Sequence, residues 1–109
     1  MADTGMKHDT GKTPVYRGLF KYFPRALLAV ADVSAAGYKK YKTWGGWLMI
    51  DDGLDRYSDA MGRHMLNEQI EGDYDEETGC LHAAQEAWNA LARLELILRS
   101  KDERKGSAV

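Results

Sequence analysis

The sequence predicts an all-α protein: a helical bundle of three long helices plus a short N-terminal element, completed by homo-oligomerisation. The 109-residue chain contains only two prolines and is rich in helix-forming residues. Apolar side chains recur at three- and four-residue spacing in three separate segments, which is the pattern of amphipathic helices. Three helices bury only a modest core, so their exposed edges favour a bundle that a dimer or higher assembly completes.

Composition and charge exclude several other classes of protein. The length suits one domain and is too short for a two-domain dinucleotide-binding enzyme or a β/α barrel. With 15 basic and 17 acidic residues, the chain lacks the basic excess of a module that binds a nucleic-acid duplex. No stretch reaches the roughly 18 apolar residues of a membrane span. The single cysteine, Cys80, favours a reducing, cytoplasmic setting. We therefore expect neither a nucleic-acid duplex nor a membrane as partner.

The N-terminal part of the chain is expected to hold an arm, a short element and the first helix. Residues 1–14 are polar and form the arm, and the aromatic residues 15–23 form a short turn or helix. Pro24 suits the first position of a helix, where its missing N–H costs nothing. An apolar face continues from there to Tyr41. The end of this helix carries cations that complement the helix dipole, namely Lys39, Lys40 and Lys42.

The second helix is expected over residues 54–71, and Gly72 ends it. Asp51 or Asp52 supplies its N-cap. Ahead of the helix, residues 48–50 form a short apolar run that is either a strand or a buried loop, because periodicity does not separate the two.

The third helix follows an acidic turn at residues 73–79. Thr78 is the expected N-cap, and the helix covers residues 79–100. Residues 101–109 form a charged tail that we expect to fray. The single domain of the protein therefore spans residues 15–100.

The second and third helices each carry a stripe of polar side chains at three- and four-residue spacing. The stripe of the second helix contains Asp59, Arg63, His64, Glu68 and Glu71. The stripe of the third helix contains His82, Gln85, Glu86, Asn89 and Arg93. An antiparallel hairpin of the two helices would bring His64, Glu68 and His82 together beside the acidic turn.

Such a cluster suits a divalent metal ion. Carboxylates are hard oxygen ligands for Mg²⁺ or Mn²⁺, and an ion held by several of them also binds phosphate. The side chains that we expect to hold the ion are Asp59, Glu68 and Glu71, together with an acid of the turn, which contains Asp73, Asp75, Glu76 and Glu77. A solvated role is the alternative, because Asp59 and Arg63 have the spacing of a surface ion pair. The chain lacks the zinc motif H-E-x-x-H, which makes zinc the less favoured metal.

Basic and aromatic residues offer a second kind of chemistry. A candidate phosphate patch consists of Lys12, Lys39, Lys40 and Lys42. Lysines at a helix end also serve the helix dipole alone, so this patch has a purely structural alternative. Trp44 and Trp47 provide rings that either stack a nucleobase or fill the core.

The order of several short motifs along the chain resembles one family. The motifs are Asp9-Thr10-Gly11-Lys12, Gly37-Tyr38-Lys39-Lys40-Tyr41 followed by Trp44, Tyr57-Ser58-Asp59-Ala60, Arg63-His64, the run from Glu71 to His82, and Ala87-Trp88-Asn89-Ala90-Leu91. Their order resembles the dATP/dGTP diphosphohydrolase family common in phages, a branch of the MazG-like all-α nucleotide pyrophosphohydrolases that includes the MazZ enzymes. The resemblance covers residues 9–98, and its most specific part includes Gly-Asp-x-Asp-x-x-Thr-Gly-x-x-His from Gly72.

The resemblance implies a helical, oligomeric enzyme that depends on Mg²⁺ or Mn²⁺ and works in the cytoplasm, that of the host if a phage encodes it. Such enzymes use water to cleave a purine deoxynucleoside triphosphate between the α and β phosphates, which releases a monophosphate and pyrophosphate. The expected catalytic residues are His64, Glu68, Glu71 and Asp75, of which Glu68 and Glu71 come from the geometry of the hairpin. The expected nucleotide-binding residues are Lys12, Lys39, Lys40, Trp44, Arg63, His82, Glu86 and Asn89.

Two departures from the family pattern leave a second function open. MazG enzymes carry a Glu-Glu-x-x-Glu run on an early helix, whereas the first helix here has only Asp32. The second histidine expected after His82 is replaced by Ala83-Ala84-Gln85. The alternative is a non-catalytic protein that binds and sequesters a signalling nucleotide of host defence.

Overall fold

The computed structural model confirms the all-α fold class, and it describes residues 10–104 of the chain. Residues 1–9 of the predicted arm and 105–109 of the predicted tail lie outside this described part. The elements in chain order are the π-helix η2 (Tyr16–Phe20), α1 (Pro24–Tyr41), the 3₁₀-helix η3 (Gly46–Met49), α2 (Gly53–Glu71) and α3 (His82–Arg104). No strand forms within residues 10–104, although Tyr74 and Leu81 make an isolated antiparallel bridge. None of these helices combines the length and the apolar character that crossing a bilayer requires.

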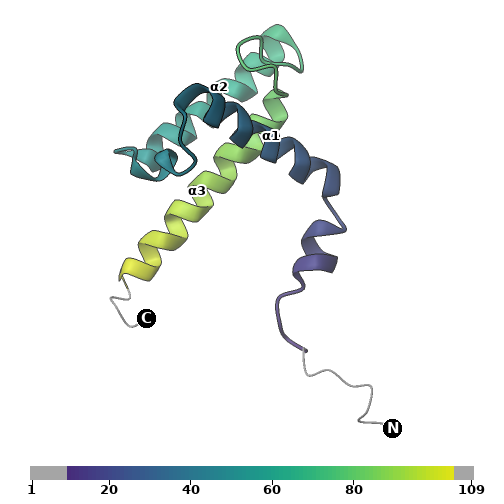
Figure 1. Ribbon diagram of the computed structural model, residues 1–109, viewed down its shortest axis with the longest axis vertical. Coiled ribbons are helices and arrows are strands. Elements are labelled where there is room, and N and C mark those ends of the chain that lie inside the picture. Colours follow the sequence, from purple (N-terminus) through teal and green to yellow (C-terminus); the bar gives the residue numbers. More distant parts are fainter. Residues whose placement is uncertain (1–9, 105–109) are drawn as a thin grey trace.

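α2 and α3 form an antiparallel hairpin, and α1 crosses α3 beside it (Figure 1). The best-buried side chains of the described residues all lie on α3 and are His82, Ala84, Gln85, Asn89 and Ala92. Most of these are polar, so the most protected part of this fold is a polar surface between helices. Buried polar groups of this kind need hydrogen-bonding partners. His82 and Gln85 find theirs on α2 and on the turn, whereas Asn89 donates to the Gln85 carbonyl on α3 itself.

An aromatic cluster ties α1, η3 and α2 to α3. The rings of Trp47, Tyr57 and Trp88 meet edge to face, with centroids 5.5–6.0 Å apart. The Trp88 indole N–H donates to Ser34 Oγ on α1 at 2.9 Å, and the Tyr57 hydroxyl donates to the Trp47 carbonyl at 2.6 Å. Each aromatic pair of this kind stabilises a fold by about 0.5–1.5 kcal/mol beyond its area burial. The cluster therefore sets how α1 lies against the hairpin.

The first two long helices begin and end close to the predicted positions. Pro24 is the first residue of α1, and Lys42 ends it in the left-handed conformation with φ 60°. α2 ends at Glu71 before Gly72, whose φ is 97°. Asp52 occupies the N-cap position of α2, but it adopts φ 56° and makes no side-chain cap hydrogen bond. A capping side chain normally needs an extended backbone, which Asp52 lacks.

The predicted start of the third helix is wrong. α3 begins at His82 rather than Gly79, because the preceding turn has its own backbone hydrogen bonds. The His82 N–H, for example, donates to the Asp73 carbonyl at 2.8 Å. Thr78 does not cap the helix, since its Oγ1 accepts a hydrogen bond from the Cys80 N–H at 3.1 Å inside the turn.

Two further predicted boundaries differ from the structure. Residues 48–50 do not form the predicted strand or loop. The 3₁₀-helix Gly46–Met49 covers the first two of them, and Ile50 follows it in an extended conformation. α3 continues to Arg104, past the predicted end at residue 100, so the first residues of the predicted tail are helical.

The N-terminal part of the described chain extends away from the hairpin (Figure 1). The radius of gyration is 18.0 Å, whereas a compact domain of about 100 residues has one near 13 Å. The extended segment exposes large apolar side chains, namely Val15, Tyr16, Leu19, Phe20, Tyr22 and Phe23. In a single copy of the chain, the described residues therefore leave the apolar side chains of residues 15–23 largely exposed.

Candidate functional site

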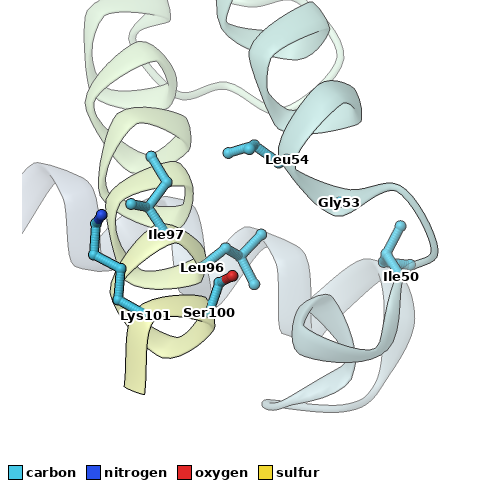
Figure 2. A pocket seen from close by; sticks show the side chains of 7 residues that line it. All are labelled: Ile50, Gly53, Leu54, Leu96, Ile97, Ser100 and Lys101. Carbon is cyan, nitrogen blue, oxygen red and sulfur yellow. The ribbon is translucent and has the colours of Figure 1, made fainter. Parts of the chain in front are cut away.

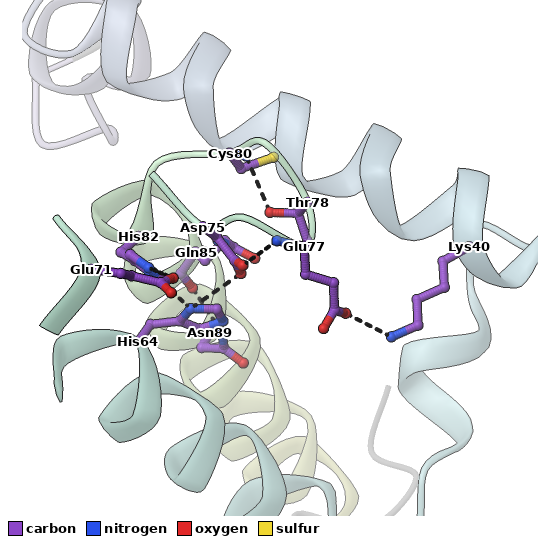
Figure 3. A network of polar contacts seen from close by, with 10 residues as sticks. All are labelled: Lys40, His64, Glu71, Asp75, Glu77, Thr78, Cys80, His82, Gln85 and Asn89. Carbon is purple, nitrogen blue, oxygen red and sulfur yellow. Dashed lines mark hydrogen bonds and ion pairs between the residues drawn. The ribbon is translucent and has the colours of Figure 1, made fainter. Parts of the chain in front are cut away.

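Three potential metal ligands converge where the α2–α3 hairpin turns (Figure 3). His64 comes from α2, Asp75 from the turn, and His82 is the first residue of α3. One ligand atom from each lies within 4.8 Å of the others. The Nδ1 atoms of the two histidines are 3.0 Å apart, and His64 Nδ1 is 3.9 Å from Asp75 Oδ2. These separations fit neighbouring donors around one ion, since nitrogen and oxygen ligands bind metals such as zinc at about 2.0–2.2 Å.

The turn holds the Asp75 carboxylate in place. Asp75 Oδ1 accepts a hydrogen bond from the Glu77 backbone N–H at 2.9 Å, and Oδ2 accepts one from Gln85 Nε2 at 3.1 Å. The Asp75 carbonyl accepts a hydrogen bond from the N–H of Gly79, which has the left-handed φ of 76°. Glycine suits this position because residues with a Cβ rarely adopt that conformation. Local hydrogen bonds thus fix the carboxylate beside the histidines.

Glu71 orients His82 from behind. The Nε2 atom of His82 lies 2.6 Å from Glu71 Oε1, and the His82 side chain is only 1% exposed. We assign the Nε2 proton to this short contact, which leaves the Nδ1 lone pair of a neutral ring facing His64. A carboxylate behind a histidine is the usual partner of a metal-binding imidazole, because it fixes the tautomer and the ring orientation. Glu71 therefore lies behind a ligand rather than at the centre of the cluster.

Two further carboxyl groups interact across the α2–α3 interface, namely Glu68 of α2 and Glu86 of α3. Glu68 follows His64 by four residues, and Glu86 follows His82 by four residues. Glu86 Oε2 is buried and has no hydrogen-bonding partner among the described residues. Burial raises the pKa of Glu86, and so do a hydrogen bond with Glu68 and the negative charge of that side chain. A buried oxygen without a hydrogen-bonding partner destabilises the fold, and binding a proton or a cation between the two carboxyl groups would remove this penalty.

The electrostatics of the centre keep one histidine neutral and the aspartate ionised. Desolvation lowers the pKa of His64, as do the neighbouring His82 and Arg63, although Asp75 opposes the effect. Burial alone would raise the pKa of Asp75. The hydrogen bonds from the Glu77 backbone and from Gln85, together with the histidines, outweigh burial and leave that pKa below its ordinary value. A neutral imidazole and a carboxylate are the forms that bind a metal.

Lys40 connects the end of α1 to the turn. Its Nζ lies 3.3 Å from Glu77 Oε1, and both side chains are largely exposed (Figure 3). Contacts with Tyr41 and with Glu77 raise the pKa of Lys40, so the side chain is a permanent cation. The Glu77 backbone N–H binds Asp75, so one residue of the turn contacts both the lysine, through its side chain, and the aspartate, through its backbone.

The whole described site falls within a family match. Residues 2–105 match the family described as dATP/dGTP diphosphohydrolase, N-terminal. This chain belongs to that family. A protein of Salmonella phage PMBT28 named dATP/dGTP diphosphohydrolase is 36% identical over 110 residues, a match that covers 96% of this chain and 34% of that protein. The chain thus spans about a third of the length of this relative. No solved structure matches the chain significantly.

The donor set fits the divalent metal ion that membership of a diphosphohydrolase family implies in general. Imidazole nitrogens favour transition metals, and carboxylate oxygens favour Mg²⁺ and Mn²⁺. His64 and His82 supply the nitrogens, and Asp75 supplies an oxygen. The buried, unpartnered Glu86 Oε2 is a further oxygen that a cation would satisfy. This mixed set suits Mn²⁺ better than Mg²⁺, which prefers oxygen ligands alone.

Most of the predicted metal-binding and catalytic residues gather around this turn. The predicted residues that the structure brings together are His64, Glu68, Glu71, Asp75, His82 and Glu86. Asp59 and Arg63 are exposed on α2, and neither supplies an atom to the metal cluster of the described residues. Lys12 precedes η2 in the N-terminal segment, and that segment extends away from the hairpin (Figure 1).

The remaining predicted residues lie around the edge of the cluster. Lys39 and Trp44 are exposed near the end of α1, and the Trp44 ring stacks on Tyr38. Asn89 is buried on α3, where its Nδ2 donates to the Gln85 carbonyl at 2.8 Å. The Asn89 amide nitrogen thus donates to the backbone of its own helix.

Sequence reasoning missed the roles of Gln85 and Glu77. Gln85 follows His82 by three residues, so its place on the polar stripe was the available signal. The Glu77 backbone follows Asp75 by two residues, the spacing of a turn in which an aspartate side chain binds the backbone. The Lys40–Glu77 contact joins residues far apart in the sequence, and no local pattern indicates it.

A hollow at the opposite end of the hairpin does not share this chemistry (Figure 2). It has a volume of about 380 Å³ and lies between the start of α2 and the end of α3. Its lining residues are Ile50, Gly53, Leu54, Leu96, Ile97, Ser100 and Lys101. This mostly aliphatic lining contains no carboxylate and no histidine, unlike the cluster at the turn.

Proposed function

We propose that this chain is the catalytic domain of a hydrolase that converts dATP and dGTP to the monophosphates and pyrophosphate. The observation that carries the proposal is the convergence of His64, Asp75 and His82 in a chain of the diphosphohydrolase family. The phage relative's name supports the same substrates. The polar, partly buried turn is the place in the described chain where charged phosphates meet suitable partners.

Mn²⁺ or Mg²⁺ is the proposed cofactor, held by His64, Asp75 and His82. When bound, the ion supplies charge neutralisation of the phosphates and a lower pKa for a water ligand. The chain's own residues prepare this site before any ion arrives. Glu71 contacts the Nε2 atom of His82 and leaves Nδ1 facing His64, and hydrogen bonds from the turn and Gln85 lower the pKa of Asp75.

The Glu68–Glu86 pair is the proposed proton acceptor for the attacking water. The raised pKa of Glu86 makes its carboxylate a stronger base than an ordinary glutamate, which favours a role in accepting a proton. Lys40 is the proposed phosphate contact, because its exposed cation contacts Glu77 of the same turn that carries Asp75. General-base catalysis of this kind contributes about 10²–10⁴-fold to a rate.

Self-association through the exposed apolar residues 15–23 is a second part of the proposal. The side chains of Phe20 and Phe23 are about half exposed, and Tyr22 is 72% exposed. Apolar side chains clustered on one segment mark an interaction surface. Light scattering coupled to size-exclusion chromatography tests this, with Phe20→Ser expected to reduce the mass of the assembly. A wild-type chain that elutes as a monomer at high concentration would contradict it.

The test of the enzymatic proposal is incubation of the chain with each of the four deoxynucleoside triphosphates and Mn²⁺, Mg²⁺ or a chelator. Chromatography separates monophosphate from diphosphate products. We expect metal-dependent monophosphate from dATP and dGTP, and loss of at least 100-fold of this activity in Asp75→Asn. Asp102→Asn is the matched control, because Asp102 is exposed near the other end of α3.

Binding without turnover would replace this proposal with the sequestering alternative. The observation behind that alternative is the sparse acid content of α1, where Asp32 is exposed and contributes nothing to the described metal cluster. Calorimetric binding of a purine nucleotide that is recovered unchanged, with or without metal, would support it.

A further inference from the structure

Residues 15–23 present a row of apolar side chains to solvent. The members of this row, at three- and four-residue spacing, are Tyr16, Leu19, Phe20 and Phe23. All four are 40–67% exposed. This is the spacing with which an amphipathic helix places its anchors in an apolar groove of a partner. The row therefore has the form of an inserting surface that needs a groove to receive it.

The backbone holds this segment away from its own hairpin. The Lys21 N–H donates to the Tyr16 carbonyl at 2.8 Å, and the Phe23 N–H donates to the Leu19 carbonyl at 3.0 Å. The Leu27 N–H donates to the Phe23 carbonyl at 2.9 Å, which joins the segment to the first turn of α1. These hydrogen bonds support the direction that Figure 1 shows, in which the segment extends away from the hairpin. Its apolar row is thus left open to a second molecule.

The hollow between the start of α2 and the end of α3 is a groove of suitable size and character (Figure 2). Its volume of about 380 Å³ falls within the roughly 300–1,000 Å³ of protein binding pockets. Its aliphatic lining comes from Ile50, Leu54, Leu96 and Ile97. No residue of the segment 15–23 lines it in the same chain. The hollow is therefore open to the segment of another copy.

The charges of the two surfaces are complementary. Residues 10–31 contain four basic residues and no acid. Residues 50–56, which form the α2 side of the hollow and its flanks, contain three exposed acids and one exposed cation. The acids are Asp51, Asp52 and Asp55, and the cation is Arg56. On the α3 side, the charge of Lys101 is offset by that of the adjacent Asp102. Opposite charges around an interface steer two surfaces together and fix their register, so the hollow favours a cationic segment.

A single copy of the chain also buries very little apolar surface. The buried apolar side chains of residues 10–104 are Ala84 and Ala92. Small domains need most of their apolar surface covered to be stable, and obligate dimers obtain that cover from a second subunit. A second copy carries both the segment and the hollow, so a reciprocal exchange of segments closes a symmetric pair.

We propose that residues 15–23 of one copy dock in the hollow of a second copy, which returns the same contact. The inference rests on the self-association proposed above, and it names the surface that receives the segment. The apolar row enters the aliphatic hollow, and the cations of the segment lie beside the acids of residues 50–56. The metal cluster is at the opposite end of the hairpin, so this interface and the metal chemistry are tested separately.

Sedimentation equilibrium of the full chain measures the dissociation constant of the pair. Ser100→Trp fills the hollow, because Ser100 lines it and is exposed. Phe20→Ser removes an anchor from the apolar row. Each substitution should weaken association about tenfold or more, as the loss of an interface anchor does. Ser100→Ala is the matched control, since it leaves the hollow open and should associate as the wild type does.

Mixing the two variants separates this docking from other modes of association. A pair made of one Phe20→Ser chain and one Ser100→Trp chain keeps one intact contact, between the unchanged segment of one and the unchanged hollow of the other. The mixture should therefore associate more tightly than either variant alone. No gain on mixing overturns the inference. Wild-type association by Ser100→Trp also overturns it and leaves the self-association standing, whereas a monomeric wild-type chain refutes both and leaves the enzymatic proposal untouched.

Charge reversal tests the complementarity of the two surfaces. Arg17→Glu combined with Lys21→Glu should weaken association at least about tenfold, because like charges then face each other. Asp51→Lys combined with Asp55→Lys should do the same. A chain with all four substitutions again has opposite charges on the two surfaces and should recover most of the lost affinity. A fourfold variant that associates no better than either double variant overturns the inference.

Discussion

Replacing Glu71 with glutamine tests whether this carboxylate prepares His82 to bind a metal. Glu71 Oε1 lies 2.6 Å from His82 Nε2, and His82 is 1% exposed, so no water replaces the lost partner easily. Glutamine keeps the shape of the side chain and an acceptor oxygen, but it removes the negative charge. The His82 ring should then hold its tautomer less firmly and donate less electron density to the metal.

The expected magnitude follows from the contact and its exposure. A hydrogen bond to a charged group contributes about 1.5–3 kcal/mol. The Glu71 side chain is 29% exposed, so solvent screens part of this interaction and the lower end of the range applies. About 1.4 kcal/mol corresponds to a tenfold change in affinity. Glu71→Gln should therefore weaken Mn²⁺ binding about tenfold, within the 10–100-fold range typical of residues behind a ligand.

Calorimetric titration of the chain with Mn²⁺ measures this change. Glu76→Gln is the matched control, because Glu76 is an exposed residue of the same turn and should bind Mn²⁺ as the wild type does. His82→Ala should bind Mn²⁺ far more weakly than either variant. Wild-type Mn²⁺ affinity in Glu71→Gln, with His82→Ala impaired, would refute the argument that Glu71 acts through His82.

Three other predictions follow from the turn and its surroundings. Gly79→Ala should destabilise the chain by about 1–2 kcal/mol in chemical denaturation, because Gly79 has φ 76° in open space and the cost is backbone strain alone. In the metal-free chain the pKa of His64 lies below its ordinary 6.5, so the unfolded state binds more protons as pH falls. Stability should therefore decrease on acidification below about pH 6.5, and His64→Gln should flatten this part of the curve of melting temperature against pH. Lys40→Ala should leave the melting temperature unchanged, because its contact with Glu77 is exposed, and should raise the KM for dATP with less effect on kcat.

The helices and their polar stripes could be predicted from local pattern. Apolar spacing and Pro24 placed α1, and Gly72 placed the end of α2, because these signals act within one or two helical turns. The start of α3 could not be found this way. Thr78 has the chemistry of an N-cap, but the hydrogen bonds of the turn use its hydroxyl and delay the helix to His82.

The structure brings some of the predicted site residues together and gives them contacts that the sequence did not indicate. The stripes indicated that His64 and His82 meet near the acidic turn, and the structure brings their Nδ1 atoms to 3.0 Å. Glu71 looked like a metal ligand because it is an acid on the same stripe, yet it faces the far side of the His82 ring. Asp59 shares the stripe pattern but is exposed, because it precedes His64 by five residues and so lies about 140° from it around the helix.

By itself, the sequence determined that this chain is helical, and it predicted a polar hairpin of the second and third helices beside the acidic turn. Periodicity and turn residues carry that information because they are local. Only the tertiary structure decided which side of His82 is occupied by Glu71, that Lys40 meets Glu77 across the fold, and that Trp44 is a surface ring while Trp47 and Trp88 are packed. Those outcomes depend on the register of the hairpin and on how the aromatic cluster sets α1 across α3, and long-range packing alone fixes both.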